Sequence, residues 1–180
     1  GSEEAVAAAH AQYHGADNMT DAQAALFVLA DVEDPRRDEA FAHFHARFRH
    51  DPLVLDKWFT IQATSSRSDA LDRVRELARH PDFQLTNPNR VRALVGAFSS
   101  ANGVRFHDRS GGGYAFLADV VLELDGKNPQ VASRLVSAFN DWRRYDEARQ
   151  MRLQAELQRI AGHAGLSKDV YEIVSRALSR

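Results

Sequence analysis

Apolar residues recur at three- and four-residue intervals along nearly the whole chain, and they hardly ever alternate over the length of a strand. Phe41, Phe44 and Phe48 follow this spacing in one segment, and Val91, Leu94 and Phe98 approximate it in another. Residues at such intervals lie on one face of an α-helix, where they can be buried together. The pattern therefore predicts an all-α protein.

Residues typical of helix starts divide this pattern into segments. Asp34, Asp51, Asn87 and Asn128 each precede a proline, a pair that caps a helix and begins its first turn. Further starts are expected at a capping box of Thr20 and Gln23, at Ser66 or Ser68, near Tyr114, near residue 144 and at Ser167. These signals predict about nine or ten helices, with one long irregular loop over residues 100–113.

Short connections between the expected helices predict that successive helices turn back on one another as antiparallel pairs. Capped units recur at intervals of roughly 15 to 20 residues, which favours a HEAT- or armadillo-like α-solenoid and leaves a compact bundle as the alternative. The large apolar residues that we expect to be buried are Phe44, Trp58, Leu77, Leu94, Phe98, Leu117, Leu135 and Phe139.

The amino-acid composition limits the classes of binding partner and indicates a cellular compartment. The 180 residues include 23 Lys and Arg against 25 Asp and Glu, so no overall positive charge attracts nucleic acid or an anionic membrane. Cysteine is absent, which fits a reducing compartment, and we expect a cytoplasmic protein without nucleic-acid or membrane partners. Gly1-Ser2 resembles a protease-cleavage remnant, so residues 3–180 are expected to form a single helical domain cut from a longer polypeptide.

Two groups of histidines have spacings that could be considered for metal binding. His10 and His14 are spaced to share one helix face, but Ala11 stands where a zinc peptidase motif needs glutamate, and the sequence marks no third ligand. An exposed histidine pair is the preferred interpretation, and His43, His45 and His50 are expected at a solvated rim. We therefore assign no metal ligand and no catalytic residue to this chain.

Four segments of the sequence resemble one known family. They are HDPLVLDKWFTIQATS (50–65), NPNRVRALVGAF (87–98), GGYAFLADVVLELDGKNPQVASRLV (112–136) and WRRYDEARQ (142–150). They are similar to the carboxy-terminal region of bacterial aminopeptidase N, a zinc gluzincin aminopeptidase, and the resemblance extends over residues 20–178. The family's catalytic motifs, HExxH with a later Glu and GxMEN, do not occur here.

The resemblance implies a noncatalytic helical domain that closes the active-site chamber of a larger metallopeptidase. The expected partners are the catalytic domain of the same polypeptide and the peptide substrate. The parent's zinc belongs to that catalytic domain, so no cofactor is expected in this chain and the isolated chain is not expected to be an enzyme. Family precedent, matched through NPNRVR and NPQVASR, implies that Arg92, Gln130 and Arg134 contact the peptide beyond the scissile bond.

The residues themselves leave one alternative for the role of these three side chains and one for the function of the whole chain. Arg92 follows the cap at Asn87, and Gln130 and Arg134 are four residues apart behind the cap at Asn128, so they can share a helix face. They can equally form ordinary ion pairs within the domain. The alternative function is a free-standing helical-repeat adaptor that binds a protein or peptide.

Overall fold

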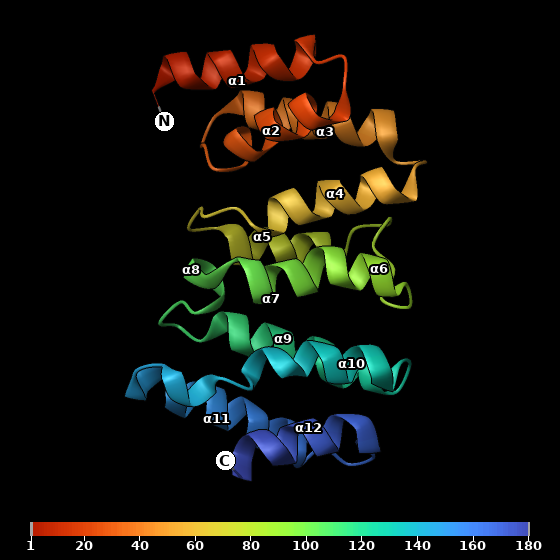
Figure 1. Cartoon of the computed structure of the whole chain (residues 1–180), viewed down its shortest axis with the longest axis vertical. Helices are drawn as coiled ribbons and strands as arrows, with labels where there is room; N and C mark the ends of the chain where they lie inside the picture. Colours follow the sequence, from red (N-terminus) through yellow and green to blue (C-terminus); the bar gives the residue numbers. More distant parts are fainter. Residues whose placement is uncertain (1, 180) are drawn as a thin grey trace.

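The computed structural model describes residues 2–179, which form a layered stack of helices with the two ends of the chain at opposite ends of the stack (Figure 1). The first half contains α1 (Glu3–Gly15), α2 (Met19–Ala30), α3 (Pro35–Phe48), α4 (Pro52–Ala63), α5 (Ala70–Leu77), α6 (Pro88–Val91), the π-helical turn η1 (Arg92–Gly96) and α7 (Ala97–Ala101). The second half contains α8 (Gly103–Phe106), α9 (Gly112–Asp125), α10 (Pro129–Val136), the 3₁₀ turns η2 (Ser137–Phe139) and η3 (Trp142–Arg144), α11 (Glu147–Ala161) and α12 (Lys168–Ser179). No strand occurs in this part of the chain, which confirms the all-α prediction.

Successive helices pack as antiparallel pairs and each pair rests on the next. Helix α1 packs on α2 and α3, α4 packs on α3, α5 and η1, and α9 packs on α10 and α11. Helix α12 closes the array against α10 and α11. This arrangement is the predicted armadillo-like solenoid.

Four predicted caps are confirmed, because the side chains of Asp34, Asp51, Asn87 and Asn128 each accept hydrogen bonds from backbone amides of the first helical turn. Ser167 likewise accepts from the amide of Val170, at 3.3 Å.

Two predicted starts are wrong. Thr20 lies inside α2, and Asn18 caps this helix by accepting from the amide of Asp21 at 2.9 Å. Neither Ser66 nor Ser68 caps α5, which follows Asp69. In both cases more than one polar residue precedes the apolar pattern, and the local sequence does not decide which of them begins the helix.

Two segments differ from the expected boundaries. The predicted loop over residues 100–113 contains the short helix α8, whose amide at Arg105 donates to the side chain of Asn102 at 3.2 Å. The helix expected from residue 144 begins at Glu147, because Asp146 caps it and the residues before it form a 3₁₀ turn. A single helical turn buries too little apolar surface to show periodicity in sequence, so α8 was not predictable in that way.

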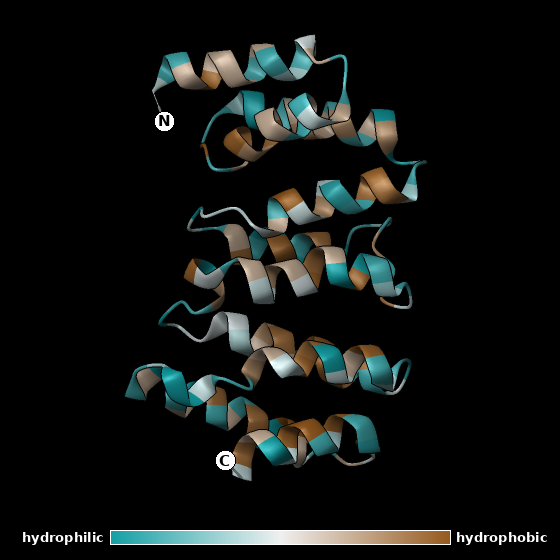
Figure 2. Ribbon diagram, in the orientation of Figure 1, coloured by the Kyte–Doolittle hydropathy of each residue, from teal (hydrophilic) through white to brown (hydrophobic). Residues whose placement is uncertain are grey.

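The core runs through every layer of the stack. Apolar residues occur in each helix pair in Figure 2, and the buried ones form one cluster that extends from Val6 in α1 to Ala177 in α12. All eight residues expected to be buried are at most 8% exposed, with Phe44, Leu94, Phe98, Leu117 and Phe139 fully inaccessible. Each layer therefore depends on its neighbours to bury its apolar face, as repeat architectures require.

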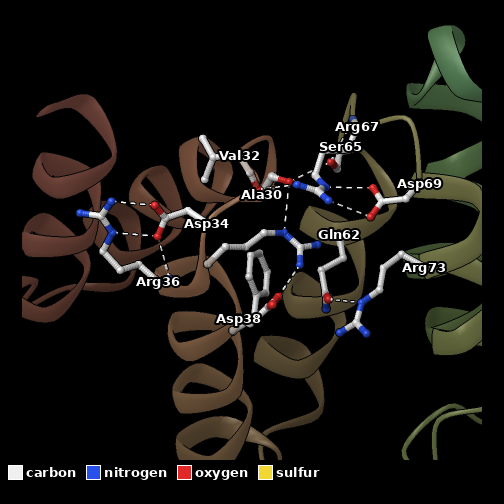
Figure 3. A network of polar contacts seen from close by, with 12 residues as sticks. Ala30, Val32, Asp34, Arg36, Asp38, Gln62, Ser65, Arg67, Asp69 and Arg73 are labelled. Carbon is white, nitrogen blue, oxygen red and sulfur yellow. Dashed lines mark hydrogen bonds and ion pairs between the residues drawn. The ribbon is translucent and has the colours of Figure 1, made fainter. Parts of the chain in front are cut away.

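Polar contacts fasten the layers at their turns. Arg67, after α4, donates to the carbonyl of Val32 at 2.7 Å, and Ser65 donates to the carbonyl of Ala30 at 2.9 Å (Figure 3). The buried Asn102 donates to the carbonyls of Ala63 and Ser65, at 2.9 and 2.7 Å. These side chains satisfy carbonyls that the helix ends leave without partners.

Between residues 2 and 179, no helix is both long and apolar enough to cross a bilayer. Gly1, half of the pair interpreted as a cleavage remnant, lies outside the described residues, and Ser2 caps α1 by accepting from the amide of Ala5 at 3.3 Å.

Candidate functional site

A surface hollow of about 240 Å³ lies between the segment α6–η1–α7 and helix α10. These elements occupy neighbouring layers, with α6 and α10 on the same side of the stack (Figure 1). The first wall contains Pro88, Arg92, Gly96, Ser99 and Ser100, and the second contains Val131, Arg134, Leu135, Ser137 and Ala138. Two of the three residues implied by the family resemblance, Arg92 and Arg134, therefore lie in one hollow.

Arg92 occupies the point where the helix beginning at Pro88 widens into a π-helical turn. Its Nη1 donates to the side chain of Asn89 at 3.3 Å, and its aliphatic stem lies 3.5 Å from where a Cβ on Gly96 would stand. π-Helical turns inside α-helices are rare and frequently occur at functional sites. The widened turn thus marks Arg92 as a candidate functional residue independently of the family resemblance.

Arg134 and Gln130 both lie exposed on α10, one turn apart. Arg134 lines the hollow, whereas Gln130 does not. Among residues 2–179, neither Arg92 nor Arg134 has a carboxylate at ion-pair distance, while other arginines such as Arg149 and Arg159 do. The hollow therefore presents two positive charges that its own residues do not neutralise.

Serine side chains line the same hollow as the two arginines. Ser100 donates to the carbonyl of Gly96 at 2.7 Å, and Ser137 donates to the carbonyl of Arg134 at 2.5 Å. A hydroxyl that donates its proton to its own helix keeps acceptor lone pairs for a ligand. The walls also contain apolar residues, among them Val131 and Leu135. The hollow therefore suits an extended peptide, which has a polar backbone and can carry apolar side chains. The sequence did not single out these serines, because serine is common on exposed helices.

A second hollow adjoins the first and shares Arg92 with it. It contains Asp56, whose Oδ1 lies 3.0 Å from Nε of the buried Arg90, without the alignment of a hydrogen bond. Burial raises the pKa of Asp56, while the positive charges of Arg90 and Arg92 oppose that shift. Arg90 also lies over the ring of Phe59, 5.0 Å from its centroid. Asp56 thus forms its ion pair with Arg90, while the charge of Arg92 acts on it without an ion pair.

Two groups of side chains bring potential metal ligands within 4.8 Å of one another, and both join residues that are distant in the sequence. In the first group, Glu39 of α3 joins the predicted pair His10 and His14 of α1. Sequence reasoning missed Glu39 because 25 to 29 residues separate it from the histidines.

The second group consists of His45, His80 and Asp82. His45 was expected at a solvated rim, but it is half-buried against the indole of Trp58, with ring centroids 4.8 Å apart, and it contacts Asp82 at 2.6 Å. That expectation is corrected because α4 and the turn after α5 cover this side of α3. His43 and His50 are exposed, as predicted. Nδ1 of His43 also shares a hydrogen bond with the hydroxyl of Tyr13, 2.8 Å away.

Comparison with known proteins identifies relatives over nearly the whole chain. Residues 1–179 match a family described as "Domain of unknown function (DUF3458_C) ARM repeats". The chain is 48% identical over 166 residues to aminopeptidase N of Caulobacter vibrioides and 42% identical over 168 residues to aminopeptidase N of Escherichia coli, covering 92% and 93% of this chain. It spans 19% of the length of each of these relatives.

A solved structure shows the same fold. The crystal structure of Legionella pneumophila aminopeptidase A in complex with aspartic acid superposes with a TM-score of 0.94 at 35% sequence identity. The match covers 98% of this chain and 21% of that one. In both the sequence matches and the structural match, the chain thus corresponds to about a fifth of a longer protein.

Proposed function

Because the chain belongs to this family of armadillo-repeat domains and is homologous to the carboxy-terminal part of aminopeptidase N, we propose that it closes the peptide-binding chamber of such an enzyme. In this proposal the domain supplies no catalytic group. The parent is a hydrolase that releases amino-terminal residues from peptides, and its zinc is held in the catalytic domain of the same polypeptide. The chain spans only about a fifth of its relatives, which favours this function over a free-standing adaptor.

The hollow between α6–η1–α7 and α10 is the surface that we assign to the peptide beyond the scissile bond. The observation that carries this assignment is the pair Arg92 and Arg134, which line one hollow without carboxylate partners among residues 2–179. A guanidinium group offers several N–H donors in a planar array, which suits peptide carbonyls and a terminal carboxylate. Gln130 lies one turn from Arg134 on the same helix and is proposed to contact the peptide outside the hollow.

The test compares two substrate types in the intact aminopeptidase that contains this domain. Arg134→Ala and Arg92→Ala are each expected to lower kcat/KM for peptides of several residues by about tenfold, the equivalent of one charged hydrogen bond of about 1.5 kcal/mol. Cleavage of single-residue anilides is expected to change much less, because these substrates have no residues beyond the cleaved bond.

Arg144→Ala is the matched control, since the side chain of Arg144 is 78% exposed on η3 and does not line the hollow. It should leave both substrate types unaffected. Equal losses on peptides and anilides for Arg92→Ala and Arg134→Ala would contradict the proposal, because they would indicate a general disturbance of the enzyme.

A further inference from the structure

We propose that His10, His14 and Glu39 form a binding site for one divalent transition-metal ion, of the class to which zinc belongs, at the junction of α1 and α3. The sequence alone did not support a metal site in this chain, because it showed only two residues with the spacing of metal ligands, His10 and His14. The third ligand appears when α1 packs against α3. The proposal is independent of the function assigned to the arginine hollow.

The three ligand atoms converge on one point of the surface. Nε2 of His10 lies 2.8 Å from Oε2 of Glu39, and Nε2 of His14 lies 3.0 Å from the same oxygen. The two imidazole centroids are 4.6 Å apart. Zinc bonds of about 2.0–2.1 Å in a tetrahedron place ligand atoms roughly 3.4 Å apart. The histidine nitrogens therefore need to move away from the Glu39 oxygen by about half an ångström to admit the ion, all three ligand atoms already lie within 4.8 Å of one another, and solvent can supply the fourth ligand.

Charge and ligand chemistry favour this class of ion. Among residues 2–179, Glu39 has no Lys or Arg at ion-pair distance, and its charge partners are the two imidazoles. Two imidazole nitrogens and one carboxylate are ligands that suit zinc, nickel and copper better than magnesium or calcium.

The proposed ion would fasten the outermost helix to the rest of the stack. Helix α1 contributes Val6, Ala9 and Tyr13 to the core, and its other face is largely exposed. An ion held by α1 and α3 together binds the folded arrangement and not the unfolded chain, so it stabilises the folded state by mass action.

The second group of potential ligands is less suited to a metal. In it, Nδ1 of His80 accepts a hydrogen bond from the amide of Asp82 at 3.2 Å and lies 3.8 Å from the Asp82 carboxylate. A metal at this nitrogen would displace the backbone contact. At α1–α3 both histidines direct Nε2 at the carboxylate, and neither Nε2 contacts the backbone.

The test titrates zinc into the 180-residue chain by isothermal calorimetry, with cobalt as a second ion whose visible absorption reports the coordination geometry. We expect one ion per chain and a rise in the unfolding midpoint on binding. His14→Ala and Glu39→Gln should each weaken zinc binding by at least about tenfold. Loss of a residue that only supports a metal ligand already costs about tenfold or more, and these two residues are proposed as ligands themselves. Circular dichroism checks that each variant is folded, and both changed side chains lie on the surface.

His163→Ala and His45→Ala are the controls. His163 is an exposed histidine after α11, and His45 belongs to the second group. Both variants should bind zinc as the unaltered chain does. The proposal is overturned if His14→Ala and Glu39→Gln bind zinc normally, if His45→Ala alone abolishes binding, or if the unaltered chain binds no ion at micromolar concentrations.

Discussion

Gly113 is the position where one methyl group should disturb the stack most clearly. It lies at the start of α9, where the backbone of α8 approaches closely. A Cβ built on Gly113 would stand 2.5 Å from the carbonyl oxygen of Phe106 and 3.0 Å from its Cα. The obstacle is backbone rather than the end of a flexible side chain, so Gly113→Ala requires α8 and α9 to separate.

The expected loss follows from two opposing effects. Forcing extra atoms into a packed contact costs about 1–3 kcal/mol or more, and a backbone obstacle places Gly113→Ala at the upper end. Replacing glycine by alanine in a helix returns at most about 1 kcal/mol. The net loss should thus be about 2 kcal/mol, which for a domain of this size lowers the melting temperature by roughly 4–8 °C.

Gly126→Ala provides the matched control, because nothing lies within 4 Å of its added Cβ and its backbone has an ordinary φ of −69°. Urea unfolding followed by circular dichroism measures both variants, and comparable slopes show that the midpoints report stability. The close approach of α8 and α9 is not as we describe it if Gly113→Ala unfolds at the same urea concentration as Gly126→Ala.

Changes at three further positions have definite expected outcomes. Asn102→Ala removes two hydrogen bonds to the carbonyls of Ala63 and Ser65 and should lower the free energy of unfolding by at least about 2 kcal/mol in urea titrations. Asn102→Asp should be at least as harmful, because a carboxylate cannot donate to these carbonyls, and a negligible loss for both variants would contradict the role of the two bonds. Phe98→Ala should cost about 3–5 kcal/mol by the same assay, and a loss below 1 kcal/mol would contradict its full burial. Burial and then the charge of Arg149 lower the pKa of His107, so the unfolded chain binds more protons and stability should fall as pH decreases below about 6.5. His107→Gln should make melting temperatures between pH 7 and 5 less dependent on pH, and an unchanged dependence would refute this cause.

The sequence by itself determined the helical class, most helix starts and the principal buried residues. Periodic apolar positions and Asp-Pro or Asn-Pro pairs act within a few residues of each other, so the chain carries these signals locally. The resemblance over residues 20–178 also led to the family that the comparisons then established. Local signals failed where several polar residues competed for one cap, as at Asn18 and Thr20, and where α8 was too short to show a period.

Only the tertiary structure decided which distant residues meet. Arg92 and Arg134 lie in one hollow because the layers place η1 beside α10, whereas Gln130 remains outside it, and nothing in the local sequence separates these outcomes. Glu39 reaches His10 and His14 for the same reason, across the packing of α1 on α3. Contacts of this kind depend on how helix pairs stack, which is set by the shapes of buried side chains throughout the array and not by any one segment.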